Sequence, residues 1–281
     1  MTESGHSSGG TDRNAEHFVL CSGGKDSTAA THYTMTQILD GLQKNPVVVY
    51  LDTTTGIEDN RRYVEALCDE YGWHMWSLRT NVNYDDLVQK YGFPGPSEHN
   101  MMYNRLKERQ LSKLATVCDG KPRFWTGVRK SESRRRMAYM EETREEKRWI
   151  WKAPIIDWDD QDCLNYIKEN DIPRNSEIWD TLGKSGDCWC GAFRAREDFV
   201  IDAAAEYPDH YEWLKEVEGS VDRDGAKGLW AWASLDQKEQ RAIDMRDDDE
   251  QMHFDETGLL CSSCEIGGVD NYQSQGGEPD D

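Results

Sequence analysis

The sequence has no run of apolar residues long enough to cross a membrane, and its first residues lack the apolar core of a signal peptide. We therefore expect a cytoplasmic protein that does not bind membranes. Positive charge is also scarce, since 33 Lys and Arg residues stand against 54 Asp and Glu, giving a net charge of −21. Such a balance opposes non-specific binding to nucleic acid, and because proteins that work in high salt carry similar surfaces, we expect a halophilic source.

Two well-known phosphate-loop patterns are missing as well. Neither the Walker A sequence nor the dinucleotide pattern Gly-x-Gly-x-x-Gly occurs at the required spacing. What the chain has instead is Cys-Ser-Gly-Gly-Lys-Asp-Ser at residues 21–27, between an apolar run and a helix-like segment. Adjacent glycines let backbone N–H groups approach an anion, and the start of the helix favours a phosphate. The pattern predicts a phosphate-binding loop formed by Ser22, Gly23, Gly24, Lys25, Asp26 and Ser27.

The apolar pattern alternates between strand-like and helix-like segments. Strands are predicted at residues 18–21, 47–51, 73–78 and 124–128, and helices at residues 27–42, 58–71, 84–90 and 100–117. Such alternation predicts an α/β fold with a parallel sheet covered by helices on both faces. Ligands of these sheets bind beyond the carboxyl ends of the strands. Three loops of the chain are expected to converge there.

The second and third of these loops carry further polar groups. Asp52 and Thr54 follow the most apolar strand and could contact a ribose or a phosphate, although Asp and Thr are also ordinary helix caps. The third loop contains five cations among residues 129–136. Guanidinium groups match phosphate or sulfate oxygens. A solvated helix start is the alternative interpretation. We predict an anion-binding group made of Arg129, Glu132, Ser133 and Arg136.

These motifs together resemble the phosphoadenosine phosphosulfate (PAPS) reductase family of the PP-loop ATP pyrophosphatase superfamily. The loop at residues 22–27 is similar to the superfamily's SGGxDS loop, and residues 127–136 resemble the family's Gly-x-Arg-x-x-Glu-Ser motif. Residues 92–94 and 104–107 resemble its Gly-Phe-Pro and Arg-x-Leu-Lys elements. The resemblance covers about Phe18 to Phe193. It implies a Rossmann-like fold of the adenine nucleotide alpha hydrolase type and a role in sulfur metabolism.

The resemblance implies a nucleotide substrate but leaves the reaction open. Reductases of this family carry a catalytic cysteine in a Glu-Cys-Gly-x-His motif, which is missing here, and they usually have a degenerate phosphate loop. The intact loop favours ATP with Mg²⁺, cleaved to AMP and pyrophosphate to activate a substrate, as in Dnd-type sulfurtransferases and tRNA thiolases. The catalytic residues implied are Lys25, Asp26, Arg129 and Arg136. The alternatives are reduction of PAPS to sulfite and nucleotide binding without catalysis.

The partners implied are a sulfur donor or a thiol reductant protein. A nucleic-acid substrate is a further alternative, by similarity to the enzymes that modify DNA and tRNA. The sequence divides into a tail at residues 1–16, a nucleotide-binding domain at 17–180, a mainly helical, cysteine-containing module at 181–266 and an acidic tail at 267–281. Both tails have too little apolar surface to offset the entropy of ordering and are predicted to be disordered.

Eight cysteines in an intracellular chain are expected to be thiols or metal ligands rather than disulfides. Four of them form two close pairs, which can supply a four-sulfur shell for an iron–sulfur cluster or for zinc. We predict a shared site at Cys188, Cys190, Cys261 and Cys264. An iron–sulfur cluster is preferred on the resemblance, because related sulfur-transfer enzymes contain clusters. Cys68 and Cys163 lie at apolar helix positions and are predicted to be small buried residues.

Overall fold

The computed structural model describes residues 16–42, 46–95, 98–132, 141–183, 185–192 and 205–221. Its centre is a six-stranded sheet with the order β3-β2-β1-β4-β6-β5. The strands are β1 (His17–Leu20), β2 (Val47–Asp52), β3 (Met75–Arg79), β4 (Arg123–Trp125), β5 (Thr143–Glu145) and β6 (Ile150–Lys152). Neighbouring strands run parallel except β5, which pairs antiparallel with β6.

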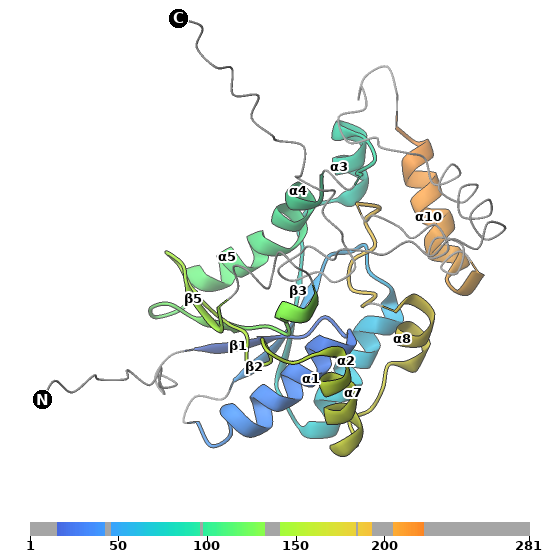
Figure 1. The fold of residues 1–281 in the computed structure, drawn as a ribbon. Coiled ribbons are helices and arrows are strands. Elements are labelled where there is room, and N and C mark those ends of the chain that lie inside the picture. Colours follow the sequence, from blue (N-terminus) through green and yellow to red (C-terminus); the bar gives the residue numbers. More distant parts are fainter. Residues whose placement is uncertain are drawn as a thin grey trace, which may run out of the picture.

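Helices connect the strands and cover the sheet (Figure 1). They are α1 (Lys25–Tyr33), α2 (Glu58–Tyr71), α3 (Tyr84–Tyr91), α4 (His99–Tyr103), α5 (Arg109–Thr116), α7 (Asp160–Glu169), α8 (Ser176–Leu182) and α10 (Pro208–Gly219). Two π-helical turns, η1 (Thr34–Ile38) and η3 (Asn104–Glu108), extend α1 and join α4 to α5. A short 3₁₀ turn, η4 (Lys130–Glu132), follows β4.

Side chains of β1 point alternately to the two faces of the sheet, as the period of a strand requires. Val19 belongs to the core cluster that includes residues of α1, α2 and α7, which lie together below the sheet in Figure 1. Phe18 and Leu20 belong to a second cluster with Leu111 and Leu114 of α5, on the other side. Both faces are therefore buried under helices, and the predicted α/β fold is confirmed.

Most predicted elements lie close to where the structure has them, and α2 has the predicted bounds. The predicted strand at residues 124–128 is shorter, because the chain leaves the sheet after Trp125 and turns into η4. The β5–β6 pair was not predicted, since Thr143-Arg144-Glu145 is polar and gives no strand pattern. Within the described ranges, no helix has the length and hydropathy needed to span a bilayer.

The two cysteines assigned to the core are buried as predicted. Cys68 on α2 is 2% exposed and Cys163 on α7 is fully covered. Burial raises the pKa of Cys68 to about 12 and that of Cys163 further still, so both remain neutral thiols. They act as small apolar residues that fill space between helix and sheet.

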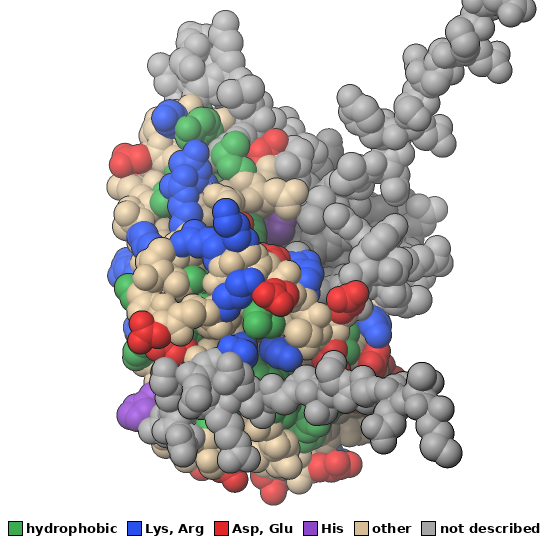
Figure 2. Space-filling model, turned by 90° about the vertical axis from the view of Figure 1, so that its left-hand side faces the viewer, with side chains coloured by type: hydrophobic (Ala, Val, Ile, Leu, Met, Phe, Trp, Pro, Cys, Tyr) green, Lys and Arg blue, Asp and Glu red, His purple; other side chains and the backbone are tan. Residues whose placement is uncertain are grey.

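Charge is distributed unevenly along this acidic chain. Between Arg105 and Lys152 there are fifteen Lys and Arg residues against seven Asp and Glu, whereas the rest of the chain is strongly acidic. Figure 2 shows one face on which Lys and Arg side chains lie close together, with fewer acidic side chains between them. The local charge along this stretch of the sequence is therefore opposite to the net charge of −21.

Replacing Leu111 by Ala tests the packing of α5 on the sheet. Leu111 is fully buried against β1, β2 and β4, so the cavity should lower the free energy of unfolding by about 2–5 kcal/mol. Val117, just after the same helix, is 77% exposed, and Val117→Ala should change stability by less than about 0.5 kcal/mol. Denaturant titrations of both variants measure this difference; similar losses would show that α5 does not pack as described.

Candidate functional site

The glycine-rich loop leaves β1 and becomes the first turn of α1. Gly23 has a φ of +79°, a conformation that other residues adopt only with strain, and Gly24 takes the N-cap position. Ser27 braces the turn, since its hydroxyl donates to the Gly24 carbonyl at 2.9 Å and accepts from the Ser22 hydroxyl at 2.9 Å. Because Gly24 has no side chain to cap the helix, the first N–H groups of α1 can point at an anion.

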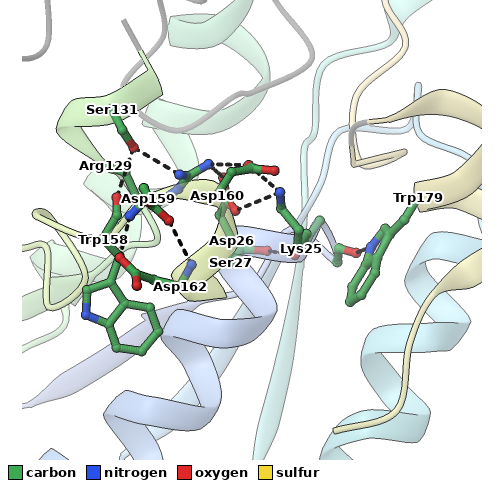
Figure 3. Close-up of polar contacts among 12 residues, drawn as sticks. Lys25, Asp26, Ser27, Arg129, Ser131, Trp158, Asp159, Asp160, Asp162 and Trp179 are labelled. Atoms are coloured by element: carbon green, nitrogen blue, oxygen red, sulfur yellow. Dashed lines mark hydrogen bonds and ion pairs between the residues drawn. The ribbon is translucent and has the colours of Figure 1, made fainter. Parts of the chain in front are cut away.

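Four charged side chains meet beside this loop (Figure 3). Arg129, which follows β4, donates to Asp26 Oδ2 at 2.6 Å and to Asp160 Oδ1 at 3.1 Å. Lys25 donates to the same Asp160 oxygen. Three segments that are far apart in the sequence thus bring together two cations and two carboxylates. Lys25, Asp26 and Arg129 of this cluster are three of the four predicted catalytic residues.

The Arg129 side chain is only 6% exposed, so its positive charge is buried. Burial alone lowers its pKa, but the charge and the hydrogen bond of Asp26 outweigh burial and raise the pKa above its ordinary value. Arg129 therefore stays a cation at every working pH. Ser131 accepts from its other guanidinium nitrogen at 3.0 Å, which fixes the plane of the group.

The rest of the predicted anion-binding group is not placed. The side chain of Glu132, together with Ser133 and Arg136, lies outside the described residues. Their participation in the site stays a prediction.

Asp52, the last residue of β2, and Thr54, in the loop after it, form a tight turn. Thr54 has a φ of +63° and donates its backbone N–H to Asp52 Oδ1 at 2.9 Å. Asp52 also lies 3.8 Å from Arg79 of β3. The turn lies at the same edge of the sheet as the glycine-rich loop, next to β1, but the Asp52 carboxylate is engaged in its own turn. Its predicted contact with a ribose or phosphate stays a prediction.

Residues 185–190 pack onto both loops. The Gly186 carbonyl accepts from the Ile57 N–H at 2.7 Å, and the Asp187 carbonyl accepts from the Thr53 hydroxyl at 2.8 Å. A Cβ atom on Gly24 would lie 2.9 Å from the Ser185 Cβ. This segment, which follows α8, therefore forms one wall of the candidate site.

A buried ion pair anchors this wall. Lys107 Nζ lies 2.6 Å from Asp187 Oδ2, and the two side chains are 2% and 4% exposed. The Ser185 hydroxyl donates to the other carboxylate oxygen at 2.8 Å. Such a pair is stable only when the remaining polar atoms are also satisfied, as the Ser185 contact helps to ensure. Lys107 lies in η3, so the pair ties the helices after β3 to the wall of the site.

The cysteines of the predicted metal site are only partly placed. Cys188 and Cys190 are buried, and Cys188 Sγ lies 3.6 Å from the Thr55 hydroxyl. Cys261 and Cys264 lie outside the described residues. Within the described ranges no three His, Cys, Asp or Glu side chains are arranged to hold a metal ion. The described residues thus do not form such a site by themselves, and the four-cysteine site stays a prediction.

Several site residues had no clear signal in the sequence. Asp160 lies between Asp159 and Asp162, which form a capping box at the start of α7, and nothing in this local acidic pattern marks Asp160 as a site residue. Asp187 and Ser185 lie next to Gly186, in a short stretch without a helix or strand pattern. Asn60 donates to the Ser22 carbonyl at 2.7 Å and Trp179 to the Gly23 carbonyl at 2.8 Å. These contacts join segments whose meeting no local pattern predicts.

Lys107→Met tests the buried ion pair. The substitution leaves Asp187 as an uncompensated buried carboxylate and should lower the free energy of unfolding by about 3–5 kcal/mol. Lys113→Met removes an exposed lysine from the adjacent α5 and should cost less than about 0.5 kcal/mol. Chemical denaturation measures both, and equal stabilities of the two variants would contradict the burial of the pair.

Gly127→Ala tests the close approach of the loop after β4 to the glycine-rich loop. The added Cβ would lie 2.8 Å from the Asp26 carbonyl carbon and from the Ser27 Cα, so the backbone of the loop must shift. We expect nucleotide affinity to fall about tenfold or more. Gly219→Ala at the end of α10 meets nothing within 4 Å and serves as the control. Calorimetric titration with ATP measures both; an unchanged affinity in Gly127→Ala would show that the loop tolerates displacement.

The fold and this edge of the sheet define a class of protein: α/β proteins of the PP-loop superfamily, with an SGGxDS-type loop between the first strand and the first helix. The chain belongs to one family within it, because the phosphoadenosine phosphosulfate reductase domain matches residues 16–181. That match covers more than half of the 281 residues.

Solved structures similar to this chain include a phosphoadenylyl-sulfate (PAPS) reductase from Candida auris in a phosphate complex. It is 18% identical, with a TM-score of 0.43, over 61% of this chain and 78% of that chain. A Candida glabrata FMN adenylyltransferase with FAD and pyrophosphate is 9% identical, with a TM-score of 0.45, over 90% and 78% of the two chains. An NH₃-dependent NAD synthetase from Campylobacter jejuni is 12% identical, with a TM-score of 0.43, over 85% and 91%. No curated protein matches the chain.

Proposed function

We propose that the protein binds ATP and cleaves it to AMP and pyrophosphate in order to activate a substrate for sulfur transfer. The observation that carries this proposal is the intact Ser-Gly-Gly-Lys-Asp-Ser loop at a strand-to-helix junction, with Lys25 and Arg129 beside it. A phosphate needs N–H donors and cations at one place, and this edge of the sheet supplies both. Family membership supports an adenine nucleotide as the ligand.

The proposed reaction has two steps. An oxygen of the acceptor attacks the α-phosphorus of ATP, the bond to the β,γ-pyrophosphate breaks, and the acceptor carries AMP. A sulfur nucleophile then displaces AMP from the acceptor. ATP enters as its Mg²⁺ complex, in which the metal offsets part of the phosphate charge.

The role proposed for the residues of this chain is to stabilise the negative charge of the leaving pyrophosphate. The N–H groups at the start of α1 and the ammonium group of Lys25 stabilise the negative charge that develops on pyrophosphate. Arg129 is oriented by Asp26 and supplies a second cation at the same place. Arg136 is proposed as a further cation, which neutralises the transferred or the accepting anion.

Reduction of PAPS to sulfite is the second candidate, and the family match favours it. The same loop and cations would hold the phosphosulfate, and a thiolate would attack its sulfur. That step requires a reactive thiol at the site. Of the described cysteines, Cys21 is closest in sequence to the loop, but burial raises its pKa, which disfavours the thiolate. A thiol reductant protein would have to supply the attacking group. Nucleotide binding without catalysis is the third candidate.

The partners of the leading reaction are proposed with it. A sulfur donor is required by the second step. A nucleic-acid acceptor is one alternative, supported by the Lys and Arg side chains gathered on one face in Figure 2. The site formed by Cys188, Cys190, Cys261 and Cys264 would bind an iron–sulfur cluster or zinc. Metal analysis of anaerobically purified protein and of its Cys188→Ser variant checks this proposal.

One assay separates the three candidate functions. The anaerobically purified protein is incubated with ATP, Mg²⁺ and candidate acceptors that include tRNA and duplex DNA, and separately with PAPS and a thiol reductant. Release of pyrophosphate in the first reaction supports ATP cleavage, whereas sulfite from the second supports PAPS reduction. Nucleotide binding with neither product supports the non-catalytic candidate.

The variant Lys25→Met tests whether the release of pyrophosphate depends on the candidate site. Loss of the ammonium group should slow pyrophosphate release about 10²-fold, because a preorganised charge at the leaving group is lost. Lys130→Met is the matched control, since Lys130 pairs with the exposed Asp157 at 2.6 Å as Lys25 pairs with Asp160. We expect the control variant to release pyrophosphate at the normal rate. Equal rates in all three proteins would place the reaction elsewhere.

A further inference from the structure

Both cations of the candidate phosphate site share one carboxylate in this structure. A single oxygen of Asp160 accepts from Lys25 and from Arg129, the latter at 3.1 Å (Figure 3). Arg129 is almost buried, whereas the Asp160 side chain is 68% exposed. The carboxylate therefore reaches from the solvent side onto the two groups that a phosphate would use.

The Asp160 side chain is not needed to cap α7, the helix that it begins. The Asp159 carboxylate accepts from the Asp162 N–H at 2.8 Å, and the Asp162 carboxylate accepts from the Asp159 N–H at 2.9 Å. This capping box closes the start of α7 without Asp160. In the described part of the chain, the Asp160 side chain makes its ion pairs with Lys25 and Arg129. Its carboxylate can thus turn into solvent without unfolding the helix.

Asp160 also lies where an anion is favoured by the backbone. It is the first residue of α7, and Lys25 is the first residue of α1, so the positive ends of two helices meet at the Lys25 contact. Partial burial alone would raise the pKa of Asp160, but the hydrogen bond from Lys25 and the charges of Lys25 and Arg129 hold it below 3.8. The group is therefore ionised at neutral pH and carries a negative charge.

We propose that Asp160 is an internal counter-ion that occupies the phosphate site while no nucleotide is bound and that the pyrophosphate group of the ligand must displace. This inference rests on the proposed function, because it takes the loop and its cations as the pyrophosphate site. Pyrophosphate carries several charges and can bind a guanidinium group through two oxygens, so it competes well against one carboxylate. An ion pair is weakened by solvent when its carboxylate is mostly exposed, as that of Asp160 is, and this makes the displacement reversible.

The two carboxylates of the cluster have different roles. Asp26 belongs to the glycine-rich loop, lies 2.6 Å from Arg129 and is mostly covered, so it stays in place and orients the guanidinium group. Asp160 comes from another helix and is mostly exposed. With Asp160 in place, the two cations are neutralised, which prevents small anions or other carboxylates of this acidic chain from occupying the site. Asp160 thereby sets how much negative charge a ligand must bring.

The test is Asp160→Asn, which keeps the size of the side chain and removes its charge. Inorganic pyrophosphate is titrated calorimetrically without Mg²⁺, at one potassium chloride concentration for all proteins because salt screens such pairs. We expect Asp160→Asn to bind pyrophosphate about 3–10-fold more tightly than the unaltered protein, since two ion pairs no longer have to be broken. MgATP should show a gain in the same direction.

Asp157→Asn is the matched control. It removes the same charge from an exposed aspartate three residues earlier, whose partner is Lys130. A gain in affinity confined to Asp160→Asn supports the proposal. Unchanged or weaker pyrophosphate binding in Asp160→Asn, or an equal gain in Asp157→Asn, overturns it. If neither the unaltered protein nor Asp160→Asn binds pyrophosphate or ATP, the proposed function fails as well, whereas binding without a gain contradicts only the role of Asp160.

Discussion

The buried ion pair between Lys107 and Asp187 is the interaction on which the arrangement of the site depends. Its partners lie 80 residues apart, one in η3 and one in the segment that follows α8. Compared with a well-packed apolar pair, a buried ion pair contributes little net stability, but loss of one partner is costly. The main effect of the pair is therefore to hold its two segments in a fixed position relative to each other. It fixes residues 185–187 so that their backbone can bond to the loop after β2 and lie against Gly24.

Charge balance at short range governs this site more than the net charge does. The chain carries −21 overall, yet Lys25 and Arg129 lie within one cluster next to the glycine-rich loop. In this structure each of these cations has a carboxylate partner, and the partners differ in exposure. The covered one, Asp26, orients Arg129, whereas the exposed one, Asp160, is the group that we propose a ligand displaces. A net charge therefore says little about which ligand such a protein binds.

Membership of the PAPS reductase domain family establishes the kind of domain but not the reaction. The choice between ATP and PAPS depends on groups at two different places. The intact phosphate loop, with Ser27 bracing its turn, suits a pyrophosphate. PAPS reduction depends instead on a thiolate, and the described cysteines at the site are buried. On these grounds we favour ATP cleavage.

The sequence by itself determined the α/β fold, the positions of the first four strands along the chain and the glycine-rich loop between the first strand and the first helix. Each of these follows from local patterns: a period of two residues in strands, a longer period in helices, and adjacent glycines where strand turns into helix. The bounds of α2 and the burial of Cys68 and Cys163 were predictable for the same reason.

Only the tertiary structure decided which charges meet. No local pattern in the sequence assigned a role to Asp160 or to Asp187. Both are brought to the site because α7 packs beside α1 and because the chain after α8 folds back over two loops. The polar strand β5 forms for a similar reason, because β6 adds to the edge of the sheet at β4 and β5 then pairs with β6. Contacts of this kind depend on packing between distant segments, which leaves no periodic signal in the sequence around either partner.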